Sequence, residues 1–146
     1  MSTPDAITLV DLTPTHPLLD EAYTVLIELR TQLDRDAYVA LFTSEQHANW
    51  TSTAAIIDDF VVGVVNWRLQ RNTAHGFGAF IDDLCTTQTR RSQGVGAAMS
   101  RHVIGRARDL GCNDVTLTSG NQRLDAHRFY LREGWVDSSK FFRYAL

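Results

Sequence analysis

Residues 82–97 read Asp-Asp-Leu-Cys-Thr-Thr-Gln-Thr-Arg-Arg-Ser-Gln-Gly-Val-Gly-Ala, and this segment is the most informative part of the chain. Its pattern predicts a strand that passes through a short polar loop into the start of a helix. Gly94 and Gly96 remove side chains where a backbone must approach a ligand. The first turn of a helix also offers unpaired N–H groups and the positive end of its dipole. The segment therefore predicts an anion-binding site, and a diphosphate suits it best.

Three glycine-rich phosphate loops compete for this segment. A Walker loop needs Lys and then Ser or Thr after its last glycine, but Ala97 follows Gly96 and the only lysine is Lys140. A dinucleotide fingerprint needs a third glycine where Met99 stands. The pattern that matches is R-x-x-G-x-G, which begins at Arg91. It resembles the acyl-CoA loop of the GNAT superfamily of N-acetyltransferases.

A second segment, Ala126–Trp135, reads AHRFYLREGW. It resembles the A-x-x-F-Y-x-x-x-G-F/Y/W segment that follows the acyl-CoA loop in GNAT enzymes, and Asn121 stands where the family often has an asparagine. Two such segments in the right order are far less frequent by chance than either alone. The resemblance is firm over residues 79–146, and within the family it is closest to aminoalkylphosphonate and similar small-amine N-acetyltransferases.

Composition limits the class of protein. The 146 residues are expected to form a single domain, 1–146, and 44% hydrophobic with 21% charged residues is ordinary for a globular chain. With a net charge of −3 and dispersed arginines, we expect no nucleic-acid partner. The five histidines have no metal-ligand spacing, so we expect no metal. No apolar run has the length of a membrane span, so we expect no membrane partner.

The cysteines and the N-terminus favour the cytoplasm. Cys85 falls in a predicted strand and Cys112 just after a predicted helix, which favours free thiols over a disulfide framework. Residues 1–5 have neither a basic region nor an apolar core of the kind that secretion signals carry.

Periodicity and turn residues predict an order of elements along the chain. Helices are expected at 18–30, at 36–46 with Asp34 as the N-cap, at 93–110 before Gly111, and at 124–133 before Gly134. Strands are expected at 7–12, 53–57, 60–69, 79–86, 114–119, 135–136 and 141–146, with a loop at 72–78. The order β-α-α-β-β-β-α-β-α-β, with a further strand at the end, predicts an α/β (α+β) layer structure with a mixed sheet. This order agrees with the GNAT fold, which implies a mostly antiparallel twisted sheet of six to seven strands with about four helices on both faces.

The resemblance implies acetyl-CoA as cosubstrate and assigns residues to it. The strand at Leu84, Cys85 and Thr86 would pair through its backbone with the pantetheine arm, and Asn121 would hydrogen-bond that arm or orient the acid. The diphosphate would lie on the amides of Arg91, Ser92, Gln93, Gly94, Val95, Gly96 and Ala97. The sequence departs from the usual spelling at Ser92, where glycine is common, and at Gln88, where proline is frequent.

Tyr130 matches the family's acid, which protonates the departing thiolate of coenzyme A. The base is open between Asp82, Asp83 and ordered water. Neighbours on a strand face opposite sides, so we expect at most one of the two carboxylates in the cleft. Cys85 as a nucleophile is disfavoured because the sequence signals no His or acidic partner nearby. Five cationic or titratable side chains that could bind an anionic acceptor read better as solvated surface: Arg30, Arg35, Arg68, Arg71 and His75.

The function expected from these residues is direct acetyl transfer to a primary amine, in a cleft between the strands that end at Thr86 and Ser119. A small-molecule amine is the preferred acceptor. The turn at 33–36 falls in the helix 1–helix 2 region, which often lines the acceptor pocket in this superfamily. The alternatives are a non-catalytic acyl-CoA sensor and a protein N-terminal or lysine acetyltransferase. Homodimers are frequent among relatives, and the sequence does not specify the oligomeric state.

Overall fold

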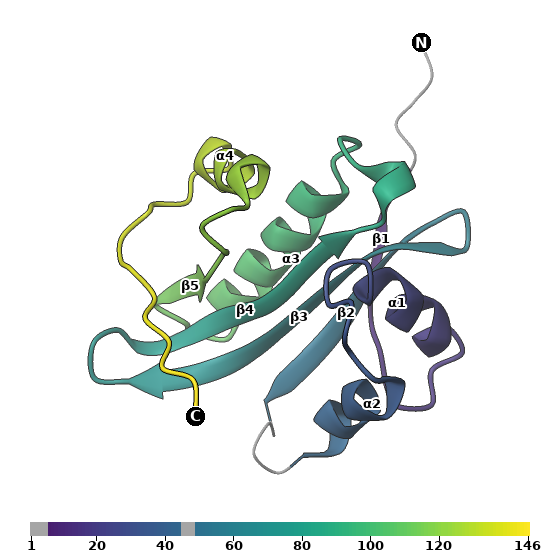
Figure 1. Cartoon of the computed structure of the whole chain (residues 1–146), viewed down its shortest axis with the longest axis horizontal. Helices are drawn as coiled ribbons and strands as arrows, with labels where there is room; N and C mark the ends of the chain where they lie inside the picture. Colours follow the sequence, from purple (N-terminus) through teal and green to yellow (C-terminus); the bar gives the residue numbers. More distant parts are fainter. Residues whose placement is uncertain (1–5, 45–48) are drawn as a thin grey trace. The chain divides into compact units, whose positions relative to one another are not determined.

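The computed structural model describes residues 6–44 and 49–146 (Figure 1). The chain divides into two compact units, 1–116 and 117–146, which are described in turn. The single domain expected over 1–146 stays a prediction. The first unit carries the sheet, three helices and the glycine loop, and the second carries the last helix.

The sheet has the order β1-β2-β3-β4-β5. Its strands are β1 (Thr8–Asp11), β2 (Trp50–Ile57), β3 (Phe60–Asn72), β4 (Gly76–Thr86) and β5 (Asp114–Leu117). The β1/β2, β2/β3 and β3/β4 pairs are antiparallel. The expected mixed α/β architecture is confirmed, but the described residues form five strands rather than six or seven. Residues 135–136 and 141–146 form no strand, since an alternating apolar sequence becomes a strand only where a backbone neighbour pairs with it.

Two tight turns connect the long antiparallel strands. Asp58 and Asp59 join β2 to β3 with φ angles of 50° and 67°, the positive values that a two-residue hairpin requires. The connection from β3 to β4 is shorter than the expected loop over 72–78, because β4 already begins at Gly76. There the side chain of Asn72 accepts the backbone N–H of His75 at 2.8 Å.

Helices α1 (Leu19–Leu26) and α2 (Arg35–Thr43) pack on one face of the sheet (Figure 1). Helix α1 ends at Leu26, four residues before the expected Arg30. After Leu26 the backbone forms hydrogen bonds between residues three apart, as in a 3₁₀ helix, which tighten the chain. Asp34 caps α2 as expected, its carboxylate accepting the N–H of Asp36 at 2.9 Å. The expected helix end at Gln46 lies outside the described residues.

Helix α3 (Val95–Asp109) packs on the opposite face, against β3 and β4. Its buried stripe recurs every four residues at Val95, Met99, Val103 and Ala107. Gly63 on β3 permits this close approach, because a Cβ there would lie 2.9 Å from atoms of Val95 and Met99. The next residue along β3, Val64, instead joins the buried cluster under α1 and α2.

In the second unit, α4 spans Leu124–Arg132, and Gly134 with a φ of 96° terminates it. Both the helix and the glycine that ends it were expected from the sequence. The N–H of Trp135 donates to the carbonyl of Tyr130 at 2.9 Å, which closes the helix end. The Tyr130 ring lies edge-on to both Phe129 and Trp135.

Candidate active site

A bulge in β4 brings both acidic side chains to one face of the sheet. Asp83 pairs with Asn66 and Ile81 pairs with Trp67, so the register of β4 against β3 skips one residue, Asp82. Asp83 accepts from Asn66 and Asp82 from Arg68. Asn66 and Arg68 are two residues apart on one strand and share a face. The expectation that the two carboxylates face opposite sides is therefore wrong, because an inserted residue resets the alternation.

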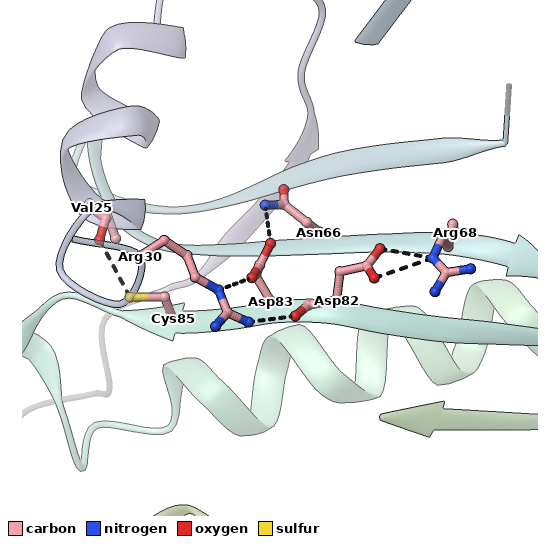
Figure 2. Close-up of polar contacts among 7 residues, drawn as sticks. All are labelled: Val25, Arg30, Asn66, Arg68, Asp82, Asp83 and Cys85. Atoms are coloured by element: carbon pink, nitrogen blue, oxygen red, sulfur yellow. Dashed lines mark hydrogen bonds and ion pairs between the residues drawn. The ribbon is translucent and has the colours of Figure 1, made fainter. Parts of the chain in front are cut away.

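Arg30 connects the chain that follows α1 to this bulge (Figure 2). Its Nε donates to Asp83 Oδ1 at 2.6 Å and its Nη2 to the backbone oxygen of Asp82 at 3.1 Å. The second oxygen of Asp83 accepts Asn66 Nδ2 at 3.0 Å. The side chain of Asp83 is 15% exposed and that of Arg30 is 52% exposed, so a largely buried carboxylate is held by an arginine that reaches solvent. The geometry fixes the Asp83 carboxylate in one orientation.

A pocket of about 500 Å³ opens beside Asp83. It is lined by Leu26, Leu29, Arg30, Thr31, Gln32, Leu33, Tyr38, Leu41, Asn66 and Asp83. The volume is in the range of small-molecule sites. The pocket is formed by the α1–α2 connection on one side and by β3 and β4 on the other. Asp82 does not line it.

Tyr38 forms an apolar wall of this pocket and is fully buried. Its hydroxyl lies 2.7 Å from Ser52 Oγ. Burial raises the pKa of Tyr38 to about 12, although the hydrogen bond with Ser52 opposes this shift. Burial thus keeps the hydroxyl protonated, and Tyr38 contributes its ring to the pocket rather than an acid.

The glycine loop has the geometry of an anion cradle. A short 3₁₀ helix, η2 (Gln88–Arg90), leads to Ser92 at φ 64° and Gly94 at φ 83°. Gly94 is the N-cap of α3 and offers no capping side chain, and no acidic residue lies in the first helical turn. A Cβ built on Gly94 meets no atom within 4 Å. Open space and uncapped amides therefore fit the diphosphate of coenzyme A.

Glu28 anchors the start of this loop to the end of α1. Its carboxylate accepts the Thr87 hydroxyl at 2.7 Å and the Gln88 N–H at 2.9 Å. A proline at position 88 lacks that N–H. Gln88, in place of the proline frequent in the family, thus supplies a backbone hydrogen bond to Glu28.

The Cys85 side chain is buried under α1. It is 5% exposed, its thiol donates to the carbonyl of Val25 at 3.4 Å, and it belongs to the apolar cluster under α1 (Figure 2). Such packing agrees with a backbone role for Leu84, Cys85 and Thr86. It gives no support to a covalent role for the thiol.

In the second unit, Tyr130 is half-buried on α4 and Asn121 is exposed in the turn before that helix. Burial raises the pKa of Tyr130, and nearby Arg123 opposes this shift. A phenol of raised pKa stays protonated through the neutral range, as a proton donor must. The assignments of Tyr130, Asn121 and the loop residues 91–97 to catalysis and binding remain predictions.

The other cationic candidates have local partners. Arg35 pairs with Asp20, Arg68 with Asp82, and His75 lies beside Asp114. Arg71 lies over the ring of Phe77. Arg30 alone among the five lines the pocket. Sequence reasoning also missed Asn66, whose signal was an amide inside an otherwise apolar strand.

No group of three or more His, Cys, Asp or Glu side chains in residues 6–44 and 49–146 is arranged to hold a metal ion. No helix in that part of the chain is long and apolar enough to cross a membrane.

Comparison with known proteins places this arrangement in a family. The sequence profile described as "Acetyltransferase (GNAT) family" matches residues 12–135. The chain belongs to the GNAT family. It is therefore an acetyl-CoA-dependent N-acetyltransferase, as the two sequence segments had implied.

Two GNAT relatives cover most of the chain. An uncharacterized N-acetyltransferase of Bacillus subtilis, YhdJ, is 34% identical over 125 residues, 84% of this chain and 88% of the relative. The aminoalkylphosphonate N-acetyltransferase of Salmonella typhimurium is 30% identical over 130 residues, 87% of this chain and 84% of the relative.

Among solved structures, the aminoglycoside N-acetyltransferase AAC(6')-Iy in complex with CoA matches with a TM-score of 0.85. The match covers 100% of this chain and 98% of the other, at 13% identity. At that identity the likeness supports the GNAT fold alone.

Proposed function

We propose that this enzyme transfers an acetyl group directly from acetyl-CoA to the primary amine of a small molecule held in the pocket beside Asp83. One observation carries the proposal. A pocket of small-molecule size is lined by an oriented, largely buried carboxylate at the end of the strand that resembles the family's cofactor strand.

The geometry favours Asp83 over Asp82 for handling the proton of the amine. Asp83 lines the pocket, whereas Asp82 pairs with Arg68 outside it. Each oxygen of Asp83 accepts one hydrogen bond, and a carboxylate has about four lone-pair sites, so capacity remains for the amine or a water. An amine is nucleophilic only when neutral, and a carboxylate in the pocket receives that proton directly or through water.

The residues would then divide the work as follows. Acetyl-CoA supplies the activated acyl group. The amine nitrogen forms a bond to the carbonyl carbon as the carbon–sulfur bond breaks. Asp83 takes the proton that leaves nitrogen, and Tyr130 gives its phenolic proton to the departing sulfur. Positioning of the amine supplies most of the rate, because the site offers no covalent step.

Two variants separate binding from chemistry. Tyr130→Phe is expected to bind coenzyme A with unchanged affinity and to lose about a hundredfold or more of kcat, the usual contribution of a general acid. Gly94→Asp is expected to lose coenzyme A binding, because it adds bulk and negative charge at a left-handed position facing the cradle. Tyr144→Phe, on the exposed tail, is the matched control and is expected to behave as the parent.

The measurements are thiol release across a panel of primary amines and calorimetric binding of coenzyme A. Full turnover in Tyr130→Phe would remove this tyrosine from the mechanism. Binding of coenzyme A by the parent protein without amine-dependent thiol release would favour the sensor over the enzyme of small amines.

A further inference from the structure

The charges of the pocket limit the kind of amine that it accepts. Of the residues that line it, Asp83 is the only acid and Arg30 the only base. Their side chains meet at 2.6 Å, so the pair contributes no net charge to the pocket. A di- or polyamine carries further ammonium groups, and each needs a carboxylate or water once it enters a pocket. The lining supplies no second carboxylate.

An anionic acceptor bound by Arg30 would lie beside the Asp83 carboxylate. The Nε of Arg30 is engaged by Asp83 and its Nη2 by the backbone oxygen of Asp82. An added carboxylate or phosphonate would compete with Asp83 for the same guanidinium and would bring two anions together. Like charges at such a separation repel, and the repulsion is strong where water is scarce.

An independent observation comes from Asn66. It is fully buried, its Nδ2 donates to Asp83, and its Oδ1 has no hydrogen-bond partner in the described part of the chain. Buried acceptors of this kind are rarely left unpaired in native proteins. Asn66 also lines the pocket, where its Nδ2 orients the Asp83 carboxylate that an amine would reach, while its Oδ1 is itself buried.

The rest of the lining suits an apolar body. Besides the uncharged polar Thr31 and Gln32, it consists of four leucines and one tyrosine ring: Leu26, Leu29, Leu33, Leu41 and Tyr38. Leu29 and Leu33 pack against the buried cluster under α1 and α2, which holds this wall in place. The Tyr23 hydroxyl donates to the carbonyl of Leu33 at 2.7 Å and fixes the loop that carries it.

We propose that the acceptor is a primary amine with a single amino group on an uncharged, largely apolar body, and that Arg30 determines this specificity by neutralising Asp83. The inference rests on the proposed function and narrows its substrate class. The amino group would meet Asp83 and Asn66, and the apolar body would contact the leucine wall. Because Arg30 cancels the charge of Asp83, the pocket would offer no net negative charge to attract a second ammonium group.

Three amines of equal chain length test the proposal: hexylamine, hexamethylenediamine and ε-aminocaproate. They differ only in the far end, which is apolar, cationic or anionic. We expect kcat/KM for hexylamine to exceed the values for the other two amines by at least about tenfold. The difference reflects the cost of placing their charged far end in a pocket that offers it no partner. Equal or better use of the diamine or of aminocaproate would overturn the inference and leave the amine acetyltransferase in place.

Arg30→Gln tests the role of the guanidinium. It leaves Asp83 uncompensated, so the diamine should gain at least about tenfold relative to hexylamine, whatever the change in absolute rate. Arg30→Lys retains the charge and should keep most of the parent's discrimination. Arg35→Gln is the matched control, since Arg35 forms a similar 2.6 Å ion pair, with Asp20, outside the pocket.

The outcomes are distinct. An unchanged diamine-to-hexylamine ratio in Arg30→Gln would refute the assignment of Arg30. Transfer to none of the three amines would overturn the small-amine acceptor itself, and the inference with it. Discrimination in the parent that disappears in Arg30→Gln and survives in Arg30→Lys would support it, because a merely structural loss lowers all three rates together.

Discussion

Gly63→Ala is expected to weaken both stability and cofactor binding, although position 63 lies on a buried strand far in sequence from the glycine loop. The new methyl carbon would lie 2.9 Å from Val95 Cγ1 and from both Met99 Sδ and Met99 Cε. The methionine end is flexible and can swing aside. Val95 is β-branched and has few rotamers, so α3 itself must move at its first residue.

The cost follows from these contacts. Overpacking a core typically destabilises by about 1–3 kcal/mol. Since one of the two neighbours can adjust, we expect about 1.5 kcal/mol, or a Tm lower by about 5 °C for a chain of this length. A displaced first turn of α3 also presents its amides less well to the diphosphate, which is worth about 0.5–1 kcal/mol, or a twofold to fivefold rise in the Kd of coenzyme A.

Calorimetric unfolding and coenzyme A titration measure both effects. Gly105→Ala is the matched control, because Gly105 lies inside α3 and a Cβ added there meets no atom within 4 Å. Helix propensity predicts that this control gains about 1 kcal/mol. If Gly63→Ala unfolds at the parent's Tm and binds coenzyme A with the parent's Kd, the close approach of α3 to β3 does not support the cradle as argued.

Two further predictions concern the rest of the first unit. Because burial raises the pKa of Tyr38 from 10.0 to about 12, the unfolded chain ionises this phenol first. The free energy of unfolding should be insensitive to Tyr38 below pH 10 and fall between pH 10 and 12 by up to about 2.7 kcal/mol, a slope that denaturant titrations should find missing in Tyr38→Phe. Glu28→Gln weakens the bonds to Thr87 and Gln88, so steady-state kinetics should give a KM for acetyl-CoA raised about threefold to tenfold with kcat less affected; Gln88→Pro removes only one bond and should cost less. An unchanged KM in both variants would contradict the anchoring role of Glu28.

Local features of the sequence predicted most of the elements. The Asp34 cap and the glycines that end α3 and α4 depend on residues within one or two helical turns of each other. The physical cause of each such feature, a capping bond or a left-handed residue, lies in residues close together in the sequence. Their positions therefore agreed with the structure to within a few residues.

The site depended on contacts between distant segments, which periodicity does not reveal. Arg30 and Asp83 are 53 residues apart, and Asn66 lies 17 residues before that aspartate. Arg30 read as solvated surface because nothing near it in sequence is its partner. The strands expected at 135–136 and 141–146 are absent for the same reason. Alternating apolar residues indicate a strand, but they do not show whether a sheet edge is available to pair with it.

The extra residue that β4 carries at position 82 has a consequence for comparing this chain with its relatives. It shifts the alternation of side chains in β4, so that odd-numbered residues before it and odd-numbered residues after it lie on opposite faces of the sheet. A relative that lacks one residue here would present the following four positions with their faces exchanged. A one-residue gap at this point of an alignment would thus mark a rebuilt acceptor site, whereas a substitution beside it would mark only a change of side chain.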